Sequence, residues 1–162
     1  VVNLIRGAKK WGHFGVFEHV QYSLSIEDVS RVLSHQLVRH RLASYAQISA
    51  RLMATRDFIV PPLDYLPVPE KIRAEIATVL RKQWELYDTL VKQGVRPEDA
   101  RYIVGDGQTT AIIMTLNARS LSHMLQMRLH PDAQWEIRAL ANEILLLVKP
   151  TAPILWEEPI VG

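Results

Sequence analysis

Hydrophobic positions recur at helical spacing over most of the chain. Apolar residues three and four apart, set among polar ones, predict amphipathic helices. The longest of these predicted helices cover about residues 26–40, 70–93, 118–129 and 131–149. One helix is also expected to end near residue 12, and a short one to run from Pro97 through Arg101. The pattern therefore predicts a chain that is largely helical.

Strand patterns are few and lie between the predicted helices. Polar and apolar residues alternate from Phe17 to Ser25, and residues 109–116 are rich in β-branched side chains. A short apolar segment at residues 57–62 is stopped by two prolines. We therefore predict an α+β (mixed α/β) fold in which a small, mostly antiparallel sheet packs with several long helices. Residues 1–162 are expected to form a single domain.

Capping residues indicate where these helices begin and end. Ser25 is predicted to cap the helix over 26–40, with Glu27 and Asp28 in its first turn. Asn117 is predicted to cap the helix over 118–129, and Pro131 to open the last helix.

Composition excludes several classes of protein. Of the 162 residues, 48% are hydrophobic and the net charge is +2, too small to indicate nucleic-acid binding. No apolar run approaches the ~20 residues that cross a bilayer, and no signal peptide opens the chain, so we expect no membrane partner and a cytoplasmic location. The first residue is Val1, so an N-terminal segment is expected to be missing.

Cysteine is absent from the chain, which excludes disulfides, thiolate metal sites and a thiol nucleophile. The six histidines show no metal-ligand spacing, and we predict no metal site.

The stretch from Arg39 to Arg51 concentrates hydrogen-bond donors. Arg39, His40 and Arg41 end a helical pattern, and Gln47, Ser49 and Arg51 follow. If the second part is extended, these last three side chains share one side. If it is helical, Gln47 and Arg51 still meet at i, i+4. Either geometry makes a cluster of donors suited to phosphate.

A second arginine lies on an apolar face. Leu121, Leu125 and Arg128 share one line of the helix over 118–129, and Arg119 and His123 fall on the neighbouring polar face. An arginine on an apolar stripe needs an anionic or carbonyl partner if it is buried.

These motifs resemble those of one family. Arg39-His40-Arg41, seven residues, Ser49 and then Arg51 is similar to the signature of the flavin-dependent thymidylate synthases (the thymidylate synthase complementing protein family). Asn117-Ala118-Arg119-Ser120-Leu121, followed by Arg128, resembles the family's C-terminal signature. Phe17-Glu18-His19, after Gly12-His13-Phe14, resembles its N-terminal motif. The resemblance spans about residues 13–154.

The resemblance implies two groups of binding residues, with Arg128 as the catalytic residue. Residues implied to face dUMP are Gln36, Leu37, Val38, Arg39, Gln47, Ile48, Ser49, Ala50, Arg51, Arg101 and Arg128. Residues implied to contact FAD are Gln21, Arg39, His40, Arg41, Gln47, Asn117, Ala118, Arg119 and His123.

The resemblance also implies a reaction and an assembly. The reaction is the reductive methylation of dUMP to dTMP, with 5,10-methylenetetrahydrofolate as one-carbon donor, FAD as cofactor and NADPH to reduce it. The assembly is a homotetramer whose active sites are shared between subunits. Because the chain has no cysteine to add at C6 of uracil, the residues independently favour electrostatic activation, and Arg128 on its apolar stripe suits that role.

Two other functions fit parts of the same pattern. One is a catalytically inactive relative that still binds flavin or nucleotide. The other is a basic helical module that binds nucleic acid through Arg31, Arg39, Arg41 and Arg51. The last is the weaker alternative, because acidic residues dilute its charge and no stacking aromatics lie between the arginines.

Overall fold

A computed structural model describes residues 2–49, 56–62 and 64–157 of the chain. These residues form two compact units. The first consists of Val1–Ser25, Gln36–Tyr45 and Ile113–Gly162, and the second of Ile26–His35 and Ala46–Ile112. Each unit is described by itself below.

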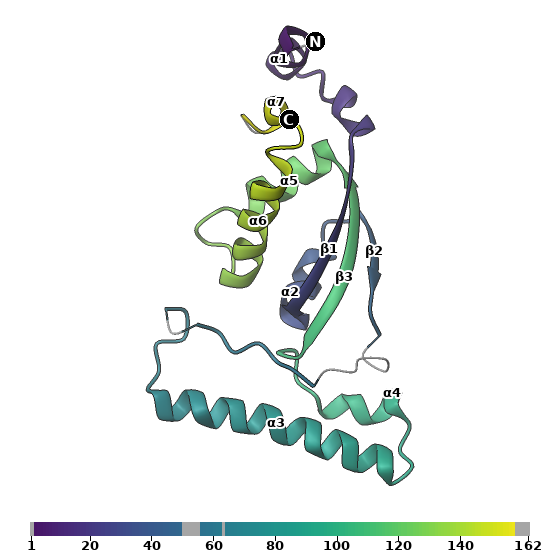
Figure 1. The fold of residues 1–162 in the computed structure, drawn as a ribbon, viewed down its shortest axis with the longest axis vertical. Coiled ribbons are helices and arrows are strands. Elements are labelled where there is room, and N and C mark those ends of the chain that lie inside the picture. The colour runs from purple at the N-terminus through teal and green to yellow at the C-terminus, as the bar shows by residue number, and fades with distance from the viewer. Residues whose placement is uncertain (1, 50–55, 63, 158–162) are drawn as a thin grey trace. The chain divides into compact units, whose positions relative to one another are not determined.

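Each strand lies between helices along the chain (Figure 1). The helices are α1 (Val2–Lys10), the 3-10 helix η1 (Phe14–His19), α2 (Arg31–Leu37), α3 (Glu70–Lys92), α4 (Pro97–Ala100), the 3-10 helix η2 (Arg101–Ile103), α5 (Ala118–Arg128), α6 (Trp135–Val148) and α7 (Pro153–Trp156). The strands are β1 (Gln21–Ser30), β2 (Ser44–Gln47) and β3 (Thr109–Asn117). The predicted α+β class is confirmed, with a small antiparallel sheet in the strand order β1-β3-β2.

The strand that precedes α2 lies later in the chain than predicted: residues 17–19 belong to η1, and the strand begins at Gln21 rather than at Phe17. Alternation was expected to end at Ser25, but β1 continues to Ser30, and the helix begins at Arg31 rather than near residue 26. Ser30, not Ser25, caps the helix, because its Oγ accepts a hydrogen bond from the backbone N–H of Leu33 at 3.0 Å. Asp28 has a φ of 54°, so the backbone before the helix takes a left-handed turn that helical spacing does not reveal.

Helix α5 occupies the centre of the first unit. Leu121 and Leu125 are almost completely buried, as is Ile137 on α6, which lies beside α5 (Figure 1). The predicted cap of α5 is confirmed, since Asn117 Oδ1 accepts a hydrogen bond from the N–H of Ser120 at 2.8 Å. At the next residue, the backbone N–H of Ala118 donates to Val20 O at 2.8 Å. This bond fixes the start of α5 against the residue that joins η1 to β1.

The last long helix starts later than predicted. Pro131 was expected to open it, whereas α6 begins at Trp135. The reason is the Gln134 side chain, whose Oε1 accepts hydrogen bonds from the backbone N–H groups of Glu136 and Ile137. Helix α7 after it was not predicted. It is too short for its hydrophobic residues to show a helical spacing.

In the second unit, α3 confirms the helix predicted over residues 70–93. Trp84 and Tyr87 from its apolar face are buried against Ala100, while Ile72 at the start of the same stripe is 40% exposed. Gly94 follows the helix with a φ of 87°, a conformation that glycine adopts without strain.

Across the residues that the structure describes, no helix combines the length and apolar character needed to cross a bilayer.

Candidate functional site

The segment after α2 turns sharply and then becomes extended. The N–H groups of Arg39 and His40 donate to the carbonyls of Gln36 and Leu37, which closes a turn at the end of the helix. The hydroxyl of Tyr45 lies 2.8 Å from Leu37 O and 3.0 Å from His40 O, within donating distance of both. Burial raises the pKa of this Tyr45 hydroxyl, so it remains a donor at neutral pH. The turn therefore holds Arg39 and His40 in one place.

Strand β2 reaches the first residue of the stretch for which the sequence left two geometries open. Residues 44–47 are extended, and exposure alternates along them, with Tyr45 and Gln47 partly buried and Ser44 and Ala46 exposed. Gln47, the first of the three donors, is therefore extended, while the sharing of one side by Gln47, Ser49 and Arg51 stays a prediction. Ala50 and Arg51 lie outside the described residues.

Arg128 meets the Arg39-His40-Arg41 segment directly. Its Nε donates a hydrogen bond to Nε2 of His40 at 2.9 Å, and its Nη2 donates to the carbonyl of Gln36 at 3.4 Å. Both bonds join residues about 90 positions apart in the sequence. A partly buried arginine on an apolar stripe has thus found a carbonyl partner, as predicted, and also an unpredicted imidazole partner.

The imidazole of His40 is held in its neutral form. Desolvation by burial, together with the positive charge of Arg128 and the nearby His123, lowers the pKa of His40 from its ordinary 6.5 to about 4. At neutral pH this ring therefore accepts a hydrogen bond at Nε2 and carries its proton on Nδ1.

Around this pair lies a cavity of about 270 Å³, here called the basic cavity. Its lining comes from the turn after α2, the end of β3 and one face of α5. The lining residues are Arg39, His40, Arg41, Leu42, Leu116, Ser120, His123, Met127 and Arg128. This volume is slightly below that of common small-molecule pockets, so the cavity fits one part of a larger nucleotide rather than a whole dinucleotide.

The N-terminal and C-terminal motifs meet beside α5. Arg119 Nη1 lies 2.6 Å from Glu18 Oε1, and its guanidinium lies 5.8 Å from the ring centre of Phe14. Gln21 Nε2 donates to the carbonyl of the same Glu18 at 2.9 Å. These contacts bring together two segments that the sequence separates by about 100 residues.

A separate polar cluster lies in the second unit. Gln47 Nε2 donates to the hydroxyls of Ser34 and Thr110, at 3.0 and 3.1 Å. Ser34 and Thr110 are both almost completely buried. Gln47 is thus fixed by buried partners, as a ligand-binding side chain should be.

Arg31 belongs to the same cluster, although the sequence had suggested it only as part of a basic helical module. Burial and the positive charge of Arg101 lower the pKa of Arg31, while Asp106 opposes them. Its Nη2 donates to the carbonyl of Ile48 at 3.4 Å. Two arginines that repel one another lose that repulsion when an anion joins them. The sequence pattern placed Arg31 inside a helix capped by Ser25, and only the structure puts it directly after the cap residue Ser30, where a cation opposes the helix dipole.

The other predicted site residues divide by exposure. Leu37 is completely buried, so only its backbone is available to a ligand, whereas Val38 and Ile48 are partly exposed, at 38% and 41%. Arg101 is exposed at the start of η2. Ser49 is partly buried just beyond β2.

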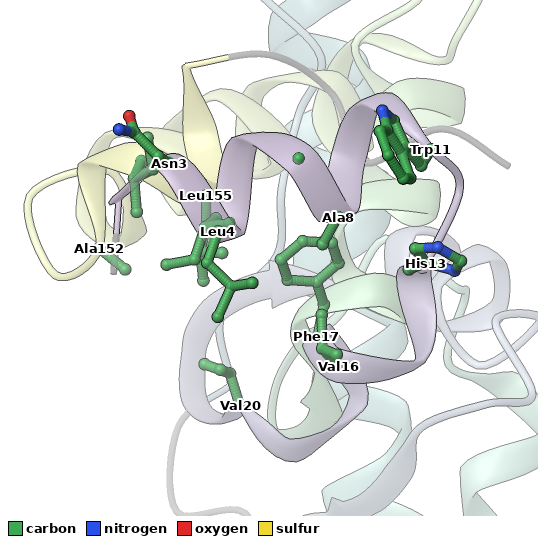
Figure 2. Close-up of a pocket in the computed structure, with 13 residues that line it drawn as sticks. Asn3, Leu4, Ala8, Trp11, His13, Val16, Phe17, Val20, Ala152 and Leu155 are labelled. Carbon is green, nitrogen blue, oxygen red and sulfur yellow. The ribbon is translucent and has the colours of Figure 1, made fainter.

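A larger cavity of about 810 Å³, here called the apolar cavity, lies between α1, η1 and α7 (Figure 2). Leu4, Phe17 and Leu155 point into it from these three elements, while His13 and Trp11 lie at one end. Its lining offers no arginine or lysine. A nucleotide phosphate therefore has no cationic partner there.

Metal binding finds no support in the described part of the chain, where no three His, Asp or Glu side chains come close enough together to hold an ion.

Comparison with known proteins gives one consistent result. The sequence profile described as "Thymidylate synthase complementing protein" matches residues 2–154. The flavin-dependent thymidylate synthase of Saccharolobus solfataricus is 43% identical over 155 residues, which cover 94% of this chain and 59% of the relative. The enzyme of the same name from Geobacter sulfurreducens is 42% identical, covering 91% of this chain and 64% of the relative. The chain thus spans about three-fifths of the length of these curated relatives.

Proposed function

The chain belongs to the thymidylate synthase complementing protein family, and we propose that it acts as a flavin-dependent thymidylate synthase, methylating dUMP to dTMP. The observation that carries this proposal is the convergence of three motif segments in the first unit. The His40–Arg128 bond joins the central motif to α5, and the Glu18–Arg119 pair joins the N-terminal motif to the same helix. Their distant positions in the sequence make this meeting a property of the fold.

The donor chemistry of the basic cavity fits an anionic nucleotide. Arg39, Arg41 and Arg128 are permanent cations that carry only donors, and the neutral His40 among them has a donor at Nδ1. Diphosphate oxygens and pyrimidine or flavin carbonyls are acceptors, so the two sets are complementary.

We propose that FAD is held by the residues that the family resemblance implied: Gln21, Arg39, His40, Arg41, Gln47, Asn117, Ala118, Arg119 and His123. Four of them, Arg39, His40, Arg41 and His123, line the basic cavity, which supports their place in this set. When bound, the flavin would supply the hydride that completes the new methyl group, after reduction by NADPH.

Arg128 is proposed to act on the pyrimidine itself. Methylation at C5 requires that carbon to be nucleophilic, and these 162 residues contain no thiol that could add at C6. A guanidinium against the uracil carbonyls favours loss of the N3 proton and stabilises the negative charge that spreads over the ring. Leu121 and Leu125 on the same helix line exclude water on the core side, which strengthens the field of Arg128.

The remaining dUMP contacts are proposed for Gln36, Leu37, Val38, Arg39, Gln47, Ile48, Ser49, Ala50, Arg51 and Arg101. The fixed orientation of Gln47 supports its inclusion, as does the proximity of Arg101 to Arg31. We add Arg31 to this group as a phosphate-binding candidate. A homotetramer with shared active sites and a cytoplasmic location complete the proposal, both from the family resemblance and composition.

The test is release of tritium from dUMP labelled at C5. The purified chain is incubated with FAD, methylenetetrahydrofolate and NADPH, and each is then omitted in turn. The proposal requires that tritium release needs the complete mixture. Flavin binding, visible as a yellow protein, without any release would instead support the inactive relative. A chain that binds neither flavin nor dUMP would reject both the active synthase and the inactive relative.

A further inference from the structure

The bond between Arg128 and His40 uses an unusual part of the guanidinium. Of the five N–H groups of Arg128, one on Nε donates to His40 and one on Nη2 donates to the Gln36 carbonyl. The other three make no hydrogen bond to a described residue, and Arg128 lines the basic cavity. The protein therefore anchors one edge of the guanidinium and leaves donors on the other for a ligand.

This anchoring requires a neutral imidazole. Nε2 of His40 accepts from Arg128 at 2.9 Å, and an imidazolium has no acceptor. The bond to Nε also helps to fix the plane of the guanidinium, because Nε, Cζ and both Nη atoms are coplanar. A ring that turned away would free the whole group to rotate about its side chain.

The backbone of His40 is itself held. Its N–H donates to Leu37 O at 3.1 Å, and its carbonyl lies 3.0 Å from the Tyr45 hydroxyl. The turn after α2 therefore fixes the backbone position from which the His40 side chain reaches Arg128. Such support from outside the site is what precise orientation of a functional group requires.

Burial, and after it the charges around the ring, keep the imidazole of His40 neutral. Arg39 and Arg41 flank it in the turn, while Arg128 and His123 face it from α5. None of the residues that line the basic cavity is an acid. A proton on His40 would therefore meet repulsion from every charged group that lines the cavity with it.

We propose that His40 is a positioning residue for Arg128: its neutral Nε2 fixes the guanidinium so that the remaining donors face the pyrimidine of the nucleotide. The inference rests on the proposed function, because it assumes that dUMP is the ligand of Arg128. It differs from a simple flavin contact, since the residue acts through Arg128.

The first experiment is a double-mutant cycle on dUMP affinity, measured by calorimetry with the complete chain. His40→Leu removes the acceptor, and His40→Gln keeps one at a similar reach. We expect His40→Leu to weaken dUMP binding on the order of tenfold and His40→Gln to restore most of it. In an Arg128→Met background, His40→Leu should have no further effect. His35→Leu and His35→Gln, at an exposed position of α2, are the matched controls.

The second experiment needs no nucleotide. Long-range ¹H–¹⁵N spectra of the free protein report the tautomer and titration of each histidine. At pH 7 His40 should carry its proton on Nδ1, and it should stay neutral to below pH 5. Arg128→Met should raise its apparent pKa part of the way towards 6.5, because burial still favours the neutral ring.

The outcomes separate the inference from the function on which it rests. A proton on Nε2, a cationic ring at pH 7, or equal effects of His40→Leu with and without Arg128 would overturn the positioning role. A wild-type chain that shows the expected tautomer but binds no dUMP would overturn the proposed function, and with it the choice of ligand. A loss of FAD affinity in His40→Leu with unchanged dUMP affinity would also overturn positioning.

Discussion

The two cavities of the first unit differ in size and in chemistry, and chemistry identifies the candidate site. The apolar cavity is about three times larger than the basic cavity, yet its lining offers little beyond hydrocarbon and the rim residues Asn3 and His13. The basic cavity is small, but three further cationic or titratable groups, Arg39, Arg41 and His123, line it beside a fixed Arg128–His40 pair. Selection by volume alone would have favoured a cavity whose lining offers no cationic partner to an anionic nucleotide.

The comparison also separates two kinds of residue. At the apolar cavity, Phe17 and Leu155 are buried and should contribute to the stability of the fold, whereas Leu4 and Trp11 are mostly exposed. The residues of the basic cavity are partly exposed and hold costly like charges together, which is a feature of binding sites rather than of stable cores. Substitutions in the two cavities should therefore affect different measurements.

The largest effect is expected for Arg128→Met, which keeps an apolar side chain of similar reach but removes every donor. Loss of one preorganised electrostatic partner lowers kcat by about 10²–10³-fold, and the rate of tritium release should fall accordingly. The midpoint of urea unfolding should stay unchanged or rise, since a like-charge repulsion is removed. Arg81→Met, at an exposed site on α3, serves as control. An active Arg128→Met variant would contradict the catalytic role of this residue.

A substitution in the apolar cavity should lower stability and leave nucleotide binding unchanged. Leu155 is 4% exposed and points into that cavity, so Leu155→Ala should lower the free energy of unfolding by about 2–3 kcal/mol. This is at the low end for buried leucines because one side of Leu155 already faces open space. Urea unfolding measures the loss, and calorimetry should show unchanged dUMP affinity well below the midpoint. Weaker dUMP binding would instead show that the apolar cavity contributes to the site.

Much of this arrangement could be predicted from the sequence, and local chemistry explains which parts. The Asn117 cap, the buried line of Leu121 and Leu125, and the long α3 follow from spacing and capping within a few residues, and all are confirmed. The start of α2 was predicted wrongly, because helical spacing from Ile26 also fits a strand that ends in a left-handed turn at Asp28.

The site itself was predictable only in part. The position of Arg128 on an apolar stripe predicted that it would need a polar partner, and the carbonyl of Gln36 is such a partner. Nothing local indicated that the partner would also include His40, because that contact joins segments 88 residues apart. Arg31 was missed as a site residue for the same reason: the neighbour that perturbs it, Arg101, lies in a distant segment.

The pH dependence of stability offers a test of the basic cavity that needs no substrate. The folded pKa of His40 is about 4, below its ordinary 6.5, so the unfolded chain takes up this proton first. The contribution of His40 to stability is therefore complete above pH 6.5 and declines as the pH falls towards 4. Between pH 7.5 and 5 the free energy of unfolding should fall by about 1 kcal/mol more in the wild type than in His40→Gln, after allowance for the solvent that reaches the ring. If the free energy of unfolding changes equally with pH in the wild type and in His40→Gln, the pKa of His40 is not lowered by folding.

The smallest effect is expected at the ion pair that joins the N-terminal motif to α5. Glu18 and Arg119 are each about half exposed, so water competes for both charges despite the 2.6 Å contact. Glu18→Gln should cost about 0.2–1 kcal/mol in urea unfolding, and the difference should shrink in 1 M salt, where the Debye length falls to about 3 Å. Glu143→Gln, at an exposed position of α6, is the matched control. Because Arg119 is also a proposed flavin contact, Glu18→Gln should alter FAD affinity more than it alters stability. If stability falls by several kcal/mol while FAD affinity is unchanged, the pair belongs with the structural residues of the apolar cavity and not with the binding residues.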